Sequence, residues 1–155
     1  SGVERRDISV YDLSPETMGT FDFVFLGSLL LHLRDPVRAL AAIRSVCGGE
    51  AVIADTVDFW SSMTRRRTPT ARLEGVERPW WWIPNVPALH QMVRSAGFDV
   101  LEATSLYFIP LGTAHPKRSW RAIPGQLRTA LGREELVTGF KGLPHAALRV
   151  RPATG

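Results

Sequence analysis

The chain has 155 residues, of which 45% are hydrophobic and 22% charged, which is typical of a globular domain and excludes a disordered or fibrous protein. Its longest apolar run, Phe21 to Leu33, is interrupted by polar residues and is shorter than the ~20 residues that cross a bilayer. The net charge of +4 comes mostly from scattered arginines, so charge alone gives nucleic-acid binding only weak support. The single cysteine, Cys47, fits a reducing compartment, and we expect the cytoplasm.

The first elements predicted are a short β-prone segment and a strand. Ile8 to Leu13 (ISVYDL) is β-prone and ends in a polar turn. Phe21 to Leu26 is nearly continuous apolar and aromatic sequence, which predicts a strand covered on both faces.

A helix and a second strand follow directly. Asp35 is a typical N-cap and Pro36 a typical first-turn residue, so the sequence predicts a helix over residues 36–46 that Gly48-Gly49 ends. Residues 50–57 (EAVIADTV) read as a second buried strand. Strand, helix and strand with short connections indicate a parallel sheet with a crossover helix.

The second half predicts one more helix and two strands. Asn85 can cap a helix whose apolar face carries Leu89 and Val93. Residues 99–109 then read as a strand, a helix is plausible near 126–131, and 145–150 read as the last strand.

We therefore expect an α/β fold with residues 21–26, 50–56 and 99–108 as neighbouring strands, and 145–150 antiparallel beside 99–108. The whole chain is interpreted as one partial domain over residues 1–155. It carries a lid-like insertion over 56–84 and an irregular excursion over 110–143.

Ligands of open α/β sheets bind beyond the carboxyl ends of the strands. Those ends carry Asp12, the small residues Gly27 and Ser28, and Asp55. An acidic residue can accept hydrogen bonds from a ligand, and small residues allow close approach to the backbone. Equally, Gly27 can relieve a tight turn and Asp12 can cap one, and spacing alone leaves both interpretations open.

One long block carries a family resemblance. The stretch "VYDLSPETMGTFDFVFLGSLLLHLRDPVRAL" resembles the central part of class I S-adenosylmethionine-dependent methyltransferases, with matches at Phe21, Asp22, Val24, Leu30, His32, Leu33, Asp35 and Pro36. "GGEAVIAD" resembles the family's fifth strand. "WWWIPNVPALHQMVRSAGFDVLEA" resembles a helix and strand of the branch that contains tRNA wobble-uridine modifying enzymes.

The resemblance implies a Rossmann-like methyltransferase sheet, mostly parallel with an antiparallel C-terminal strand. No GxGxG loop occurs in the 155 residues. Because the family's Gly-rich loop and an acidic residue after the second strand hold much of the cofactor, we expect this chain to be the C-terminal portion, with the N-terminal strands and Gly-rich loop missing.

Site roles follow from the resemblance. Tyr11, Asp12 and Leu13 match the turn on the adenine side of S-adenosylmethionine, and the backbone of Leu26, Gly27 and Ser28 matches the stretch that borders its methionine part and methyl group. His32 matches a frequent family histidine, either a base or a residue that packs the helix start.

Three consecutive indoles, Trp80, Trp81 and Trp82, cannot all face one core, so at least one is expected to line a pocket or surface. They are interpreted either as lid packing or as direct substrate contacts. No histidine has a partner at metal-ligand spacing, and with one cysteine a metal site is not expected.

The resemblance implies methyl transfer to a small molecule or an RNA base, with tRNA as a candidate partner and no membrane or metal. A non-catalytic binding or scaffold domain on the same fold remains the alternative. A nucleotide-binding oxidoreductase is a third reading, but its fingerprint loop is equally absent.

Overall fold

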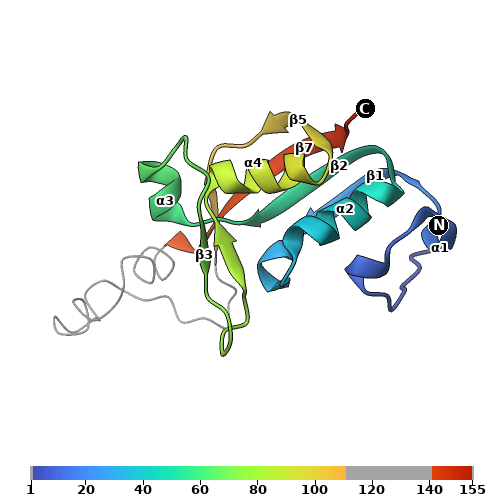
Figure 1. Cartoon of the computed structure of the whole chain (residues 1–155), viewed down its shortest axis with the longest axis horizontal. Helices are drawn as coiled ribbons and strands as arrows, with labels where there is room; N and C mark the ends of the chain where they lie inside the picture. Colours follow the sequence, from blue (N-terminus) through green and yellow to red (C-terminus); the bar gives the residue numbers. More distant parts are fainter. Residues whose placement is uncertain (1, 111–140, 155) are drawn as a thin grey trace.

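The computed structural model describes residues 2–110 and 141–154. Its strands form a five-stranded sheet and a separate two-stranded sheet (Figure 1). The larger sheet has the order β1 (Phe21–Gly27), β2 (Cys47–Thr56), β7 (Leu143–Pro152) and β5 (Phe98–Ala103), and β6 (Tyr107–Ile109) also pairs with β7. The pair β1–β2 is parallel, whereas β7 runs antiparallel to β2, β5 and β6. The expected α/β sheet with one antiparallel C-terminal strand is confirmed.

Two helices cover one face of this sheet. The helices α2 (Pro36–Val46) and α4 (Val86–Ser95) lie side by side on it (Figure 1). Both start at the predicted caps, because Asp35 accepts from the Arg38 N–H and Asn85 from the Ala88 N–H. The core between helices and sheet contains fully buried Leu40, Ile53, Leu89, Val93 and Leu148.

The prediction that Phe21 to Leu26 is covered on both faces is wrong. Alternate side chains of β1 are solvent-exposed, with Phe21 at 42%, Phe23 at 59% and Phe25 at 66%, while Leu26 is at 6%. Among the described residues β1 pairs only with β2, so it forms an edge of the sheet. The helices α2 and α4 cover the opposite face, and this leaves the three phenylalanine rings uncovered.

The two glycines that were expected to end the helix belong to β2 instead. Helix α2 ends at Val46, and Cys47, with extended backbone angles, already starts the strand. Gly49 is needed for close approach, because a Cβ there would lie 2.2 Å from the carbonyl oxygen of Asp22 in β1. Strand β2 therefore begins three residues earlier than the predicted residue 50.

The predicted neighbourhood of residues 50–56 and 99–108 is also wrong. Strand β7 lies between β2 and β5 and forms hydrogen-bonded pairs with both. The antiparallel pairing of the last strand beside β5 is confirmed, but the predicted strand over 99–109 is broken into β5 and β6. The register shift between Val100 and Glu102 places a bulge where the strand bends.

The N-terminal segment is not a strand. Val10–Asp12 form a 3-10 helix, η1, which the Ser9 hydroxyl caps by accepting from the Tyr11 N–H. A short helix α1 (Pro15–Met18) follows. A local turn replaces the β conformation here because the segment satisfies its polar groups by itself. The predicted helix near 126–131 lies outside the described residues.

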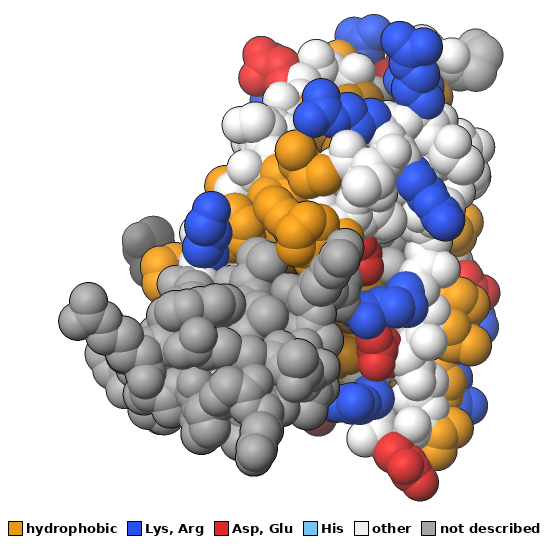
Figure 2. All heavy atoms as spheres, turned by 90° about the vertical axis from the view of Figure 1, so that its left-hand side faces the viewer, with side chains coloured by type: hydrophobic (Ala, Val, Ile, Leu, Met, Phe, Trp, Pro, Cys, Tyr) orange, Lys and Arg blue, Asp and Glu red, His pale blue; other side chains and the backbone are white. Residues whose placement is uncertain are grey.

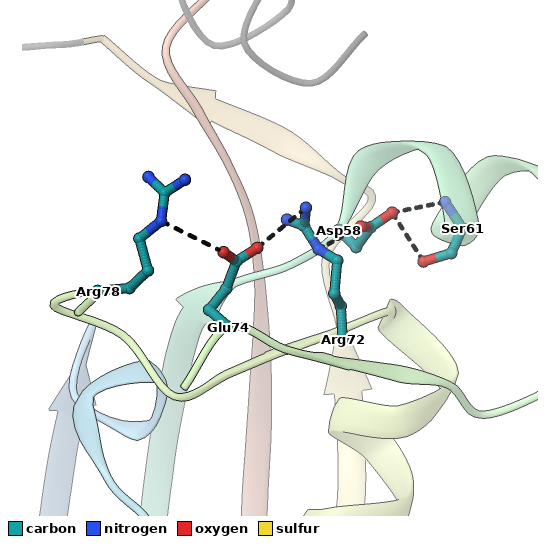
Figure 3. A network of polar contacts seen from close by, with 5 residues as sticks. All are labelled: Asp58, Ser61, Arg72, Glu74 and Arg78. Atoms are coloured by element: carbon teal, nitrogen blue, oxygen red, sulfur yellow. Dashed lines mark hydrogen bonds and ion pairs between the residues drawn. The ribbon is translucent and has the colours of Figure 1, made fainter. Parts of the chain in front are cut away.

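The segment between β2 and α4 forms its own substructure. It contains helix α3 (Phe59–Thr64) and the antiparallel pair β3 (Ala71–Leu73) and β4 (Trp82–Pro84). Asp58 caps α3 through Ser61 and also faces Arg72 at 3.7 Å, and Glu74 lies between Arg72 and Arg78 (Figure 3). This chain of charges links α3 to the hairpin.

The end of the molecule that carries α3 has a mixed surface (Figure 2). Apolar side chains lie there among basic and acidic ones, and α3 itself leaves Trp60 and Met63 exposed at 38% and 43%. None of the helices in the described part of the chain is long and apolar enough to span a membrane.

Candidate functional site at the carboxyl ends of the strands

The parallel pairing of β1 and β2 brings their carboxyl ends to one edge of the sheet. The last paired residues are Gly27 and Ala54, and the Ser28 N–H then donates a 2.8 Å hydrogen bond to the Ala54 carbonyl. The chain leaves β1 at Ser28 and turns through η2 (Leu30–His32) towards α2. Of the three ends singled out from the sequence, Gly27–Ser28 and Asp55 therefore meet in space, whereas Asp12 lies in the 3-10 helix η1 and not at the end of a strand.

The Asp55 side chain is hydrogen-bonded to the backbone of this turn. It is only 1% exposed, and its carboxylate accepts hydrogen bonds from the Leu30 N–H at 2.7 Å and the Thr56 N–H at 2.7 Å. Burial raises the pKa of the Asp55 carboxyl, against the opposing effect of those hydrogen bonds and of nearby His145. Asp55 thus supports the loop after β1 instead of facing an open site.

The cofactor residues expected in the N-terminal segment lie beside the start of α2. The Tyr11 hydroxyl accepts a hydrogen bond from the Asp35 N–H at 3.2 Å, and the Arg38 guanidinium lies 5.1 Å from the Tyr11 ring centroid. Leu13 is partly buried against the core. Asp12 is exposed, and Ser9, not Asp12, caps the turn. The carboxylate of Asp12 is therefore an available acceptor for a ligand donor.

The second cofactor stretch has three different environments. Leu26 is 6% exposed with its side chain in the core, so only its backbone can border a ligand. Gly27 is exposed, and a Cβ there would lie 2.8 Å from the Phe25 ring. Ser28 has a positive φ of 49°, which is rare for a residue with a side chain. The left-handed backbone conformation at this turn is therefore adopted by Ser28 and not by Gly27.

The expected base and the indoles lie together. His32 Nδ1 is 2.6 Å from the Pro79 carbonyl oxygen, so this nitrogen carries the hydrogen. The His32 ring is thus hydrogen-bonded to the residue that precedes the tryptophan segment (Trp80, Trp81 and Trp82). The backbone N–H of Trp81 donates to the Leu31 carbonyl, and the Arg34 guanidinium lies 4.5 Å from the centroid of the Trp81 ring. The Trp82 indole donates to the Arg34 carbonyl. These contacts fix the tryptophan segment on the loop that follows β1.

All three indoles, including that of Trp80, are partly buried. None is fully enclosed, so each keeps some ring surface that a ligand could contact, and packing and substrate contact are compatible at this position.

His145 is a residue of the candidate site that no sequence pattern indicated. It is 2% exposed on β7, and its Nε2 lies 3.0 Å from the Ser28 hydroxyl and 3.3 Å from the Thr56 hydroxyl. The partners Ser28 and His145 are 117 positions apart. No spacing pattern could have joined them, because their meeting depends on β7 inserting beside β2.

The polar and small residues near the candidate site differ in what they offer to a ligand. In the described residues no group of three or more His, Cys, Asp or Glu side chains could hold a metal ion. The exposed Asp12 carboxylate and the side-chain-free surface at Gly27 suit a ligand with an amino group that approaches the backbone.

A search of curated proteins finds tRNA U34 carboxymethyltransferases. The protein of Pseudomonas putida (strain GB-1) is 34% identical over 87 residues, which are 55% of this chain and 27% of that protein. The protein of Pseudomonas fluorescens (strain Pf0-1) is 36% identical over 89 residues, 56% of this chain and 27% of that protein. The chain thus spans about a quarter of the length of the curated relatives it matches. A scan against known protein families finds no match.

Solved structures show the same fold at low sequence identity. A methyltransferase in complex with the Trm112 methyltransferase activator of Haloferax volcanii has a TM-score of 0.53 at 14% identity and covers 88% of this chain and 55% of that chain. The 1,6-didemethyltoxoflavin-N1-methyltransferase of Burkholderia thailandensis, solved with S-adenosylhomocysteine, has a TM-score of 0.54 at 13% identity and covers 95% and 49%. The resemblance noted from the sequence is confirmed: over about half of its length the chain is similar in sequence to tRNA U34 carboxymethyltransferases, and it has the fold of solved methyltransferases.

Proposed function

We propose that this chain forms the acceptor side and part of the cofactor side of an enzyme that transfers a methyl group from S-adenosylmethionine to a small molecule or a tRNA base. The observation that carries the proposal is the identity of 34–36% over 87–89 residues with tRNA U34 carboxymethyltransferases. Those relatives transfer a carboxymethyl group to tRNA, as their name states, which makes tRNA uridine the first acceptor to test. We also propose that this activity is cytoplasmic, which the tRNA-modifying relatives support.

The proposed cofactor contacts come from two segments. Tyr11, Asp12 and Leu13 would border the adenine, and the backbone of Leu26, Gly27 and Ser28 would border the methionine. When bound, S-adenosylmethionine supplies an electrophilic methyl group, and positioning accounts for much of the rate in such a displacement. The role of this chain is then to orient the acceptor at the carboxyl ends of the strands. We propose that residues 56–84, which include the three tryptophans, form a lid over the acceptor.

The open edge of β1 supports the proposal that the cofactor site is completed by residues outside these 155. Phe21, Phe23 and Phe25 form an exposed aromatic row beside an unpaired strand edge. Such an edge normally pairs with another strand or is covered. The solved relatives match 88–95% of this chain with only 49–55% of their own length. We propose that the segment with the Gly-rich loop covers this edge.

Two measurements test the proposed function. Calorimetric titration of the 155-residue chain with S-adenosylmethionine should show weak or undetectable binding, because the Gly-rich loop supplies much of the contact surface. Tight stoichiometric binding would contradict the incomplete site. In a longer chain that includes the Gly-rich segment, Asp12→Ala should weaken binding about five- to thirty-fold, because one hydrogen bond worth about 1–2 kcal/mol is lost. An unchanged affinity would remove Asp12 from the site.

A non-catalytic scaffold is the second candidate, and the absence of a GxGxG sequence from the 155 residues favours it. The longer chain incubated with methyl-labelled S-adenosylmethionine and bulk tRNA separates the two. Label transferred to tRNA supports the enzyme, whereas cofactor-independent tRNA binding without transfer supports the scaffold.

A further inference from the structure

The hydroxyl of Ser28 and the imidazole of His145 form a pair at the candidate site. Ser28 is exposed at the end of β1, and His145 is 2% exposed on β7, with Oγ and Nε2 3.0 Å apart. One member therefore faces solvent while the other lies in the protein interior. This arrangement connects the surface of the site to a buried titratable ring.

The hydrogen-bond partners determine which ring nitrogen carries the hydrogen. His145 Nδ1 lies 3.0 Å from the Leu143 carbonyl oxygen, which can only accept. Nδ1 must therefore carry the hydrogen, and Nε2 of the neutral ring has a free lone pair. The Ser28 hydroxyl donates to Nε2, with the Thr56 hydroxyl as a second donor at 3.3 Å. The lone pairs of Ser28 Oγ remain available to accept a hydrogen from a bound molecule.

The backbone of Ser28 is held in a conformation that costs free energy. Its φ of 49° is in the left-handed region, where glycine would fit without strain. Such outliers persist where the surroundings fix them, and they cluster at functional sites. Here the strain directs a hydroxyl to His145, which glycine could not supply.

Two titratable side chains lie close to His145. The buried carboxyl of Asp55, on the neighbouring strand β2, interacts electrostatically with His145. The Tyr107 ring of β6 lies 5.9 Å from the imidazole.

We propose that Ser28 and His145 form a proton relay that deprotonates the acceptor of the proposed transfer reaction, on which this inference rests. The proton leaves an acceptor O–H or ring N–H for Ser28 Oγ, while the Ser28 hydroxyl hydrogen moves to His145 Nε2. The acceptor gains the lone pair that it needs as a nucleophile, and His145 becomes the imidazolium beside Asp55. The acceptor class is then a hydroxyl or an acidic ring nitrogen, and an amine with its own free lone pair would not need the relay.

Nuclear magnetic resonance of ¹⁵N-histidine-labelled chain tests the pair without a cofactor. We expect His145 to carry its hydrogen on Nδ1 when neutral. Ser28→Gly removes the hydroxyl while suiting the positive φ, so the melting temperature should be maintained or raised. The ¹⁵N resonance of His145 Nε2 should shift in this variant, because Nε2 loses the hydrogen bond from the Ser28 hydroxyl. Ser45→Ala is the control, because the Ser45 hydroxyl donates to the Ala42 carbonyl within α2. A hydrogen on Nε2, or an Nε2 resonance unchanged by Ser28→Gly, would overturn the relay.

A transfer assay in the longer chain, with labelled S-adenosylmethionine and bulk tRNA, tests its use. Ser28→Gly and His145→Gln should each lower the rate about 10²-fold and flatten its rise with pH. Variants that fold and keep both the wild-type rate and pH profile would overturn the relay. No transfer by the wild-type protein would count against the proposed function, and the relay would then be judged by the magnetic resonance result alone.

Discussion

The Leu30 N–H donates a 2.7 Å hydrogen bond to the buried carboxylate of Asp55 and so ties the turn after β1 to the end of β2. This contact fixes where the chain leaves the sheet and where Ser28 and His32 are presented. The turn depends on a desolvated carboxylate, and its stability therefore depends on pH.

Asp55→Asn should remove a pH-dependent part of the stability. Burial raises the pKa of the folded-state carboxyl above its unfolded value of about 3.9, so between the two pKa values the folded state binds more protons. The contribution of Asp55 to the free energy of unfolding therefore decreases as pH rises through that window. Chemical denaturation from pH 4 upward measures the free energy of unfolding of the wild type and of Asp55→Asn. The wild-type value minus the variant value should decrease as the pH rises. The exposed Asp22→Asn is the control, and a constant difference would contradict the prediction.

Gly49→Ala should destabilise the β1–β2 pair. A Cβ at Gly49 would lie 2.2 Å from the Asp22 carbonyl oxygen, which belongs to backbone that cannot move without breaking the pairing. We expect a loss of about 1–3 kcal/mol in the free energy of unfolding. Gly48→Ala is the matched control, because its Cβ would meet Thr20 at an ordinary 3.6 Å. Equal effects of the two substitutions in urea denaturation would show that close approach is not the cause.

Asn85→Ala should cost more than the loss of an ordinary helix cap. The Asn85 side chain is fully buried, accepts from the Ala88 and Thr70 N–H groups, and donates to the Arg65 and Thr68 carbonyls. Removing it takes these hydrogen bonds from the Ala88 and Thr70 N–H groups and the Thr68 carbonyl, at a cost of about 2–4 kcal/mol, while the Arg65 carbonyl still accepts from the Thr68 N–H.

The comparison variant for Asn85 is Asp35→Ala on α2, where the carboxylate caps through the Arg38 N–H alone and a loss of about 1 kcal/mol is expected. Thermal denaturation of both variants measures the difference. A smaller effect at Asn85 would show that the loop over residues 65–70 adapts.

His90 should make folding less favourable as the pH falls. Burial and the charge of Arg94 lower the pKa of His90 in the folded state. Below its unfolded pKa of about 6.5 the unfolded chain therefore binds more protons, and stability is lost as pH falls towards the folded value. His90→Gln should flatten this part of the stability curve, and Arg94→Gln should flatten it partly. A curve between pH 7 and 5 that is unchanged in His90→Gln would refute the assignment.

Local sequence signals were sufficient for the elements that carry their own start and packing information. The Asp35-Pro36 and Asn85-Val86-Pro87 caps, followed by apolar residues at helical spacing, gave the correct starts of α2 and α4. The sequences of residues 21–26 and 145–150 likewise predicted strands, which the structure contains as β1 and β7. Capping and periodicity are short-range properties, so they can be recognised without knowing what packs against them.

Tertiary structure alone decided the order of the strands and the composition of the site. The insertion of β7 between β2 and β5 depends on pairing between residues about ninety to a hundred positions apart on the β2 side and about fifty apart on the β5 side, and no local signal encodes it. That insertion brings His145 to Ser28, and the pairing of β1 with β2 brings Asp55 to the Leu30 N–H. The exposure of Phe25 was equally unpredictable, because an apolar strand has the same sequence whether its outer face is covered or bare.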